Sequence, residues 1–142
     1  MLFADASALI KRYVREPHSA PTRKRLAAGP IAVSRLSDVE VPSGLARLCR
    51  EGRLADRARD RALAAFVSDF TSWYIVELTA DVTALARRCL IRHHLRSGDA
   101  IQLASALWLQ EALVEPLEGF LAFDARLVLA ARDEPLVIVG AR

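Results

Sequence analysis

The sequence has 142 residues, enough for one compact core, and we expect residues 1–142 to form a single domain. Hydrophobic residues make up 53% of the chain, but no apolar run approaches the roughly 18 residues of a membrane span. The start of the sequence lacks the basic region and cleavage site of a signal peptide. We therefore expect a cytoplasmic protein with no membrane partner. The net charge of +3 permits a nucleic-acid partner without requiring one.

The first half of the chain alternates short apolar runs with helical patterns. Residues 2–4 form an apolar run that meets Asp5, and a helical pattern with i,i+4 apolar pairs follows until Pro17 ends it. A second strand is predicted at 31–34. Two helices are predicted after it, at about 36–50, closed by Gly52, and at 54–69.

The second half continues this alternation. A third strand is predicted at 73–78, followed by a helix at 81–94. An almost wholly apolar helix, opened by Asp99, is predicted within residues 95–110. The last predicted elements are strands at 120–123 and 136–140, with a short helix at 125–132 between them. Strands that alternate with helices predict an α/β fold, with a parallel sheet covered by helices on both faces.

Four acidic residues are predicted to meet at one edge of this sheet. In α/β folds, ligands bind outside the carboxyl ends of the strands. Asp5 directly follows the first strand, and Asp124 directly follows "FLAF". Glu40 lies in the first turns of the helix after the second strand, and Asp99 opens the apolar helix before the fourth.

Each of these acids also has a purely structural explanation. Asp99 suits a helix cap or first turn, where free N–H groups and the positive end of the helix attract an acid. Glu40 stands three residues after Ser37, the spacing of a capping box, although Pro42 would then lie inside the helix and should kink it or delay its start. Asp5 and Asp124 could each begin a strand-to-helix turn. For the acids to have no shared function, all four of these structural explanations would have to be true at once.

Converging carboxylates favour a hard divalent cation. Two carboxylates about 4 Å apart repel each other by roughly 4 kcal/mol at an effective dielectric constant of about 20. A divalent cation removes this cost, and Mg²⁺ in particular binds a few carboxylates while keeping waters and substrate phosphates as ligands. Such an ion can activate a water for attack on phosphorus. The sequence therefore predicts metal-assisted phosphoryl chemistry.

Other chemistries lack their motifs. There is no phosphate-binding GxxxxGK[ST] loop, no GxGxxG segment and no nucleophile elbow around a serine. His93 and His94 adjoin each other at a predicted helix end, where they complement the helix dipole. Cys49 and Cys89 have no Cys or His at metal-binding spacing, so we expect buried free thiols.

Four segments resemble a known family. They are "FADASALIKRY", "SRLSDVEVPSGL", "LRSGDAIQLASAL" and "FLAFDARL". Together they resemble the signature blocks of PIN-domain ribonucleases, and more narrowly those of VapC-type toxins from bacterial toxin–antitoxin pairs. The third segment is the most specific, because it follows the family pattern L-R-x-x-D-A-x-x-L-A-x-A at Leu95, Arg96, Asp99, Ala100, Leu103, Ala104 and Ala106. The resemblance spans residues 2–127.

This resemblance implies a PIN-like three-layer α/β/α sandwich with a four- to five-stranded parallel sheet. It also implies Mg²⁺- or Mn²⁺-dependent cleavage of RNA, a homodimer, and inhibition by a small cognate antitoxin. By match, the metal ligands and catalytic acids are Asp5, Glu40, Asp99 and Asp124, and Ser7 helps to hold the metal or its water.

Two positions depart from the family pattern. Ala122 stands where many relatives carry Thr or Ser, so a supporting hydroxyl is missing, and Pro42 is unusual just after Glu40. Neither change removes a ligand.

The sequence says less about the substrate. Arg12, Arg15, Arg96 and the segment "TRKR" (22–25) could steer RNA phosphates towards the acids, although any one of them could be an ordinary solvated side chain. No aromatic-rich strand of an RNA-binding kind is present, so no base-stacking platform is expected.

Several other functions stay open. The chain could be a structure-specific or RNA-processing nuclease that is not a toxin, or a binding module without catalysis. A phosphatase of the DxD type and a phosphoacceptor receiver domain fit poorly, because Ser7 occupies the position of the second aspartate and the acid pair and late lysine of a receiver are missing.

Overall fold

The computed structural model describes residues 1–140, which form a five-stranded parallel sheet. The strands are β1 (Leu2–Ala4), β2 (Ile31–Ser34), β3 (Tyr74–Val76), β4 (Gly119–Leu121) and β5 (Ile138–Val139), in the spatial order β3-β2-β1-β4-β5. All four strand pairs are parallel, so the carboxyl ends of the strands lie at one edge of the sheet.

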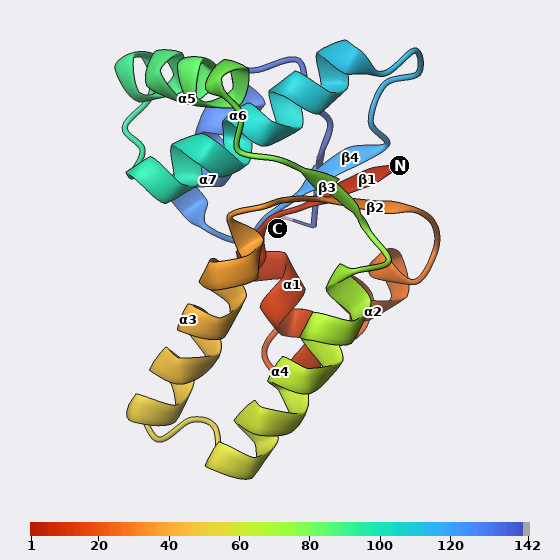
Figure 1. The fold of residues 1–142 in the computed structure, drawn as a ribbon, viewed down its shortest axis with the longest axis vertical. Coiled ribbons are helices and arrows are strands. Elements are labelled where there is room, and N and C mark those ends of the chain that lie inside the picture. The colour runs from red at the N-terminus through yellow and green to blue at the C-terminus, as the bar shows by residue number, and fades with distance from the viewer. Residues whose placement is uncertain (141–142) are drawn as a thin grey trace.

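Helices cover both faces of this sheet, as Figure 1 shows. The helices in the described part of the chain are α1 (Ala6–Tyr13), α2 (Ser19–Leu26), α3 (Ser37–Arg50), α4 (Asp56–Phe70), α5 (Ala80–Arg92), α6 (Ser97–Ala112) and α7 (Ala125–Arg132). One face packs on α5, α6 and α7, and the other on α1, α3 and α4. The predicted three-layer α/β/α sandwich is therefore confirmed.

The central strand β1 divides the two cores. Phe3 is fully buried on the α6 side, where its ring stacks on Phe120 of β4 with the centroids 5.7 Å apart. Leu2 and Ala4 point to the opposite face and pack with α1 and α3. This alternation follows from the two-residue period of a strand.

The structure differs from the prediction in one element and in several bounds. Helix α2 was not predicted, because its sequence SAPTRKRL is mostly polar and shows little helical periodicity. The strands around 73–78, 120–123 and 136–140 are shorter than predicted. Pro42 lies inside α3 without delaying its start, since the helix begins at Ser37.

Both cysteines are free thiols, as predicted, but only one of them is buried. Cys89 is buried, whereas Cys49 is half-buried, so the prediction of a buried thiol is wrong at Cys49. Within the described residues, no helix combines the length and apolar character needed to cross a bilayer.

Candidate functional site: an acidic edge of the sheet

Asp5 links the end of β1 to the start of α1. Its backbone N–H donates to the carbonyl of Leu121 at 3.0 Å, which continues the pairing of β1 with β4. Its carboxylate caps α1, because Oδ2 accepts from the backbone N–H of Ser7 at 3.0 Å. The side chain is only 5% exposed. The structural explanation of Asp5 as a helix start is thus confirmed.

Ser7 ties the ends of the two central strands together. Its hydroxyl donates to Asp5 Oδ2 at 2.5 Å and accepts from the backbone N–H of Phe123 at 2.9 Å. Phe123 directly precedes Asp124, which caps α7 by accepting from the N–H groups of Arg126 and Leu127 at 2.9 and 3.0 Å. One hydroxyl therefore connects the segments that carry both aspartates.

Glu40 is held from helix α6 and does not form the predicted capping box. Its Oε2 accepts from Gln102 Nε2 at 2.6 Å, and the same amide nitrogen donates to Ser37 Oγ at 3.0 Å. The N-cap of α3 is Leu36, with no side-chain hydrogen bond, so Ser37 lies inside the helix. The capping-box explanation is wrong because a buried amide from α6 competes successfully for both side chains.

Gly98 makes room for the other oxygen of Glu40. A Cβ atom added at Gly98 would lie 2.5 Å from Glu40 Oε1, closer than real contacts allow. The glutamate carboxylate therefore leans against the first turn of α6, one residue before Asp99.

A buried polar contact lies deeper along the same helix. Ser105 Oγ donates to the carbonyl of Ile101 at 2.7 Å and is 3.0 Å from Ser34 Oγ at the end of β2. Ser34, Ser37, Gln102 and Ser105 are each fully buried. The polar residues Gln102 and Ser105 of α6 thus fasten this helix to the segment that joins β2 to α3.

Asp99 lies in the first turn of α6, as predicted, and is half-buried. Arg96 is the N-cap of α6, and its side chain forms no capping hydrogen bond to this helix, all of which the structure describes. Burial is the main cause that raises the pKa of Asp99, and the nearby Asp124 raises it further. The backbone of Arg96 and the charges of Arg96 and Arg126 act in the opposite direction.

The acids at this edge interact with one another. Burial raises the pKa of Asp5 and of Glu40 in the first place, and hydrogen bonds from Ser7 and Gln102 oppose the two shifts. The negative charge of Asp99 raises both pKa values further, and that of Asp5 raises the pKa of Glu40. Asp5, Glu40 and Asp99 therefore lie within electrostatic reach of one another, and Asp124 joins them through Asp99.

The donor atoms suit a hard divalent cation bound by few protein ligands. Carboxylate oxygens are the ligands that Mg²⁺ and Mn²⁺ prefer, and mutual repulsion favours a compensating positive charge. In residues 1–140 no three Asp, Glu, His or Cys side chains are grouped closely enough to ligate one ion. Mg²⁺ commonly binds one or two carboxylates and keeps waters in its other positions, so this arrangement fits it.

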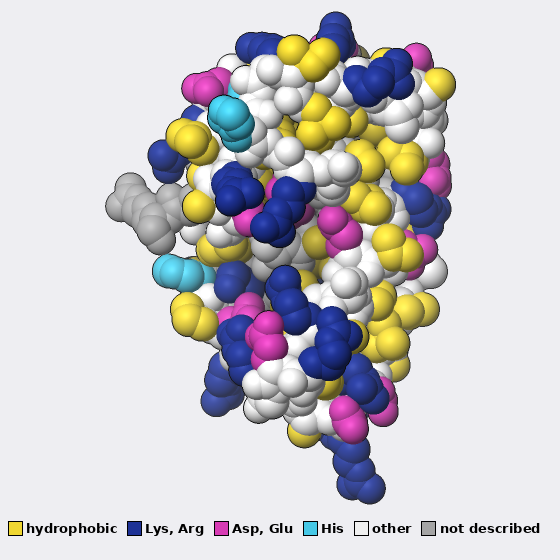
Figure 2. Space-filling view, turned by 90° about the vertical axis from the view of Figure 1, so that its left-hand side faces the viewer, with side chains coloured by type: hydrophobic (Ala, Val, Ile, Leu, Met, Phe, Trp, Pro, Cys, Tyr) yellow, Lys and Arg dark blue, Asp and Glu magenta, His cyan; other side chains and the backbone are white. Residues whose placement is uncertain are grey.

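Basic side chains surround the acids. Asp124 and Ser7 line a hollow of about 240 Å³ together with Lys11, Arg47 and Arg53. Figure 2 shows a face of the molecule on which acidic side chains stand among many Lys and Arg side chains. Arg12, one of the basic residues that could steer RNA phosphates, donates to Asp69 of α4 at 2.9 Å.

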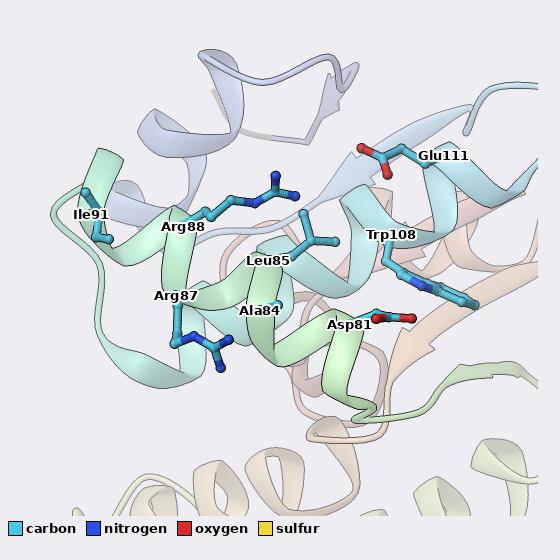
Figure 3. Close-up of a pocket in the computed structure, with 8 residues that line it drawn as sticks. All are labelled: Asp81, Ala84, Leu85, Arg87, Arg88, Ile91, Trp108 and Glu111. Atoms are coloured by element: carbon cyan, nitrogen blue, oxygen red, sulfur yellow. The ribbon is translucent and has the colours of Figure 1, made fainter.

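A second hollow, of about 740 Å³, lies on the outer side of α5 and α6. Figure 3 shows that both charge signs line it, with Asp81 and Glu111 as well as Arg87 and Arg88 around Trp108. None of the four acids of the sheet edge lines this hollow. The chemistry predicted from the sequence therefore does not lie there.

Comparison with known proteins gives one family and several similar structures. The sequence profile of the PIN domain matches residues 2–132. VapC20 from Mycobacterium tuberculosis, described as a toxin that cleaves the sarcin-ricin loop, has a similar structure, with a TM-score of 0.70, 21% identity and coverage of 98% of each chain.

Two further structures are similar at lower identity. A toxin–antitoxin complex from Klebsiella pneumoniae has a TM-score of 0.58 and 18% identity, over 89% of this chain and 88% of that one. FitAcB from Neisseria gonorrhoeae has a TM-score of 0.65 and 14% identity, over 99% of this chain and 97% of that one. No protein with a curated description matches the sequence. At these identities the likeness establishes the fold.

The repulsion at this edge predicts that Asp99→Asn stabilises the metal-free protein. Because the pKa of Asp99 is raised on folding, the folded state binds a proton more tightly than the unfolded chain, and the carboxylate destabilises the fold once the pH is above that pKa. We expect the variant to melt a few degrees higher than wild type at neutral pH in chelator, with a difference that shrinks as the pH falls through the raised pKa. Added Mg²⁺ should stabilise the variant less than wild type.

Thermal melts at several pH values, with chelator or Mg²⁺, test this. Asp81→Asn is the matched control, because Asp81 is also a first-turn acid but lies on α5, outside the acidic edge. Equal melting of wild type and Asp99→Asn, with the same response to Mg²⁺, would show that Asp99 serves only the helix.

Proposed function

Because this chain belongs to the PIN-domain family, we propose that it is an Mg²⁺- or Mn²⁺-dependent endoribonuclease and the toxin of a toxin–antitoxin pair. The observation that carries the proposal is the acidic edge, where burial and mutual repulsion raise the pKa values of Asp5, Glu40 and Asp99. Such an arrangement is costly for stability alone, whereas a hard cation and a phosphodiester substrate give it a use.

Three of the four acids are held in position by named contacts of the structure. Of the acids Asp5, Glu40, Asp99 and Asp124, one or two would bind the cation directly and the others through its water ligands. When bound, the cation would supply an activated water and stabilise the charge that develops at phosphorus. Ser7 fixes Asp5 by a hydrogen bond, Gln102 fixes Glu40, and α6 carries Asp99 on a helix locked into the core. Groups on rigid elements keep the geometry that a reaction needs.

The basic side chains beside the acids suit a phosphate backbone. Arg47 and Arg53 line the hollow that contains Asp124, and their side chains are 66% and 57% exposed, so they can contact an RNA phosphate there although both also pair with Glu51. Lys11 lines the same hollow but is buried and paired with Glu16 at 3.2 Å. Arg12 is not available for this purpose, since its guanidinium pairs with Asp69.

The proposed partners follow from the same family. Similar structures include a toxin–antitoxin complex and a FitAB complex bound to DNA, so we propose that a small cognate antitoxin binds and inhibits this chain in the cytoplasm. We also propose a homodimer. A nuclease that is not a toxin, or a binding module without catalysis, would share the fold and differ in the assays below.

Asp5→Asn should abolish cleavage while the fold persists. The amide oxygen of asparagine can still accept the two hydrogen bonds from Ser7, but the charge that would hold the cation is lost. We expect RNA cleavage by the purified wild type to require Mg²⁺ or Mn²⁺ and to fall by about 100-fold or more in the variant. Gel assays with structured RNAs and DNAs, with metal or chelator, measure this. Full activity in excess chelator would refute a metal-dependent mechanism.

Gly98→Ala should separate activity from stability. Alanine favours a helix over glycine by about 1 kcal/mol, but its Cβ would displace the Glu40 carboxylate. We expect cleavage to fall by roughly 10-fold with thermal stability in chelator equal to or above that of wild type. Gly29→Ala is the control, since a Cβ there meets no atom within 4 Å. Unchanged cleavage by Gly98→Ala would show that the position of Glu40 is unimportant.

Expression in a bacterial host tests the toxin assignment. Induction of the wild type should arrest growth, the inactive Asp5→Asn protein should not, and co-expression of the small protein encoded beside this chain should restore growth. Normal growth despite folded, active enzyme in the cells would leave a nuclease that is not a toxin.

A further inference from the structure

A hollow of about 570 Å³ lies directly beside the acidic edge. We refer to it as the Phe123 pocket, lined by Lys11, His18, Phe123, Ala125, Val128, Leu129 and Arg132. Phe123 precedes Asp124 in the chain, and its backbone N–H donates to the Ser7 hydroxyl that holds Asp5. Phe123 and Lys11 also line the smaller hollow that contains Asp124 and Ser7. A polymer lying across the acids could therefore reach this pocket.

Two flat rings form one wall of the pocket. The rings of His18 and Phe123 are stacked, with centroids 5.7 Å apart and an angle of 22° between their planes. Lys11 Nζ lies 4.7 Å from the centroid of the Phe123 ring. His18 is exposed and Phe123 half-buried, so aromatic surface faces the solvent. Nucleobases stack on surfaces of this kind with little dependence on sequence.

A β-turn fixes the position of His18. With φ of 68°, His18 is the one residue other than glycine that has a positive φ in the described chain. It is the third residue of a turn that begins at Glu16, has Pro17 in second place and is closed by the Ser19 N–H, which donates to the Glu16 carbonyl at 3.1 Å. A type II turn requires a positive φ at this position, so the turn, and not a helix cap, sets the direction of the His18 side chain.

The residues that line the pocket favour an anionic ligand. They include Lys11, His18 and Arg132 and no acidic residue. Lys11 is paired with Glu16 at 3.2 Å, whereas Arg132 stands exposed in the last turn of α7. The hollow on α5 and α6 in Figure 3, by contrast, carries acids beside its arginines and suits a polyanion less well.

We propose that the Phe123 pocket binds one nucleotide of the RNA substrate, with the base against the His18 and Phe123 rings and a phosphate near Arg132. This rests on the proposed ribonuclease function and names a part of the substrate that the enzyme grips. It differs from the expectation from sequence that no base-stacking platform is present, because His18 and Phe123 are far apart in the chain and neither lies in an aromatic-rich segment.

RNA binding without cleavage tests the proposal. The probe is a fluorescent single-stranded RNA of about ten nucleotides, matched by a version in which the bases are replaced one at a time by abasic sites. Binding is measured by anisotropy in chelator on the Asp99→Asn protein, so that no cutting occurs. Phe123→Leu keeps apolar volume and the backbone bond to Ser7 but removes the ring, and we expect it to raise Kd by about tenfold.

The abasic probes make the result specific. At one position of the RNA, replacing the base by an abasic site should raise the Kd of the parent protein. For that probe, Phe123→Leu should not raise Kd further, because the base that contacts the ring is already missing. Arg132→Gln should weaken all probes alike and reduce the dependence of Kd on salt. Arg87→Gln, on the hollow of Figure 3, is the matched control and should leave Kd nearly unchanged.

His18→Gly guards against a trivial loss of folding. Glycine accepts φ of 68° without strain, so this variant should melt no lower than its parent while binding RNA several-fold more weakly. The proposal is overturned if Phe123→Leu and His18→Gly bind every probe as the parent does. It is also overturned if both variants lose only the binding of a protein inhibitor, which would make the pocket a protein interface.

The outcome is independent of the cleavage assays. Ring-dependent RNA binding by a protein that cuts no RNA would keep this pocket and refute the nuclease. If the protein cleaves RNA but its RNA affinity does not depend on either ring, the nuclease function is supported and the role of the pocket is refuted.

Discussion

The site depends on the parallel arrangement of the strands. Because β1, β2 and β4 run in the same direction, the segments that follow them leave the sheet at one edge and carry acids of like charge to it. The cost of this convergence is visible in the raised pKa values of Asp5, Glu40 and Asp99. A fold that keeps such a cluster must hold each carboxylate in place against this repulsion. Hydrogen bonds from Ser7 to Asp5 and from Gln102 to Glu40 do so.

Two sets of hydrogen bonds hold the acids. On one side, the Ser7 hydroxyl joins Asp5 to the backbone just before Asp124, so the ends of β1 and β4 are fixed together. On the other side, Gln102 holds Glu40 from helix α6, where the small Gly98 leaves space for the carboxylate. Ala122 is buried in the core, and neither set of hydrogen bonds uses a side-chain hydroxyl at this position.

Charge is distributed to match this site. Lys11, Arg47 and Arg53 line the hollow that contains Asp124, and the Phe123 pocket shares Lys11 and Phe123 with this hollow. Arg12 shows why a basic residue in the sequence is weak evidence for substrate contact. Its side chain is bound to Asp69 of α4, a residue 57 positions away, which no local pattern indicates.

The sequence by itself determined the layer architecture and the edge at which the acids meet, since both follow from the periodicity of apolar residues and the positions where strands end. It also placed Asp99 correctly in the first turn of its helix. Only the tertiary structure decided how the acids are held. The capping box of Ser37 and Glu40 was a sound local expectation, yet the amide of Gln102, from a helix 62 residues away, binds both side chains instead. Helix α2 and the stacking of His18 on Phe123 depend likewise on distant contacts. Hydrogen bonds and ring contacts between distant segments leave no periodic trace in the chain, so the fold alone reveals them.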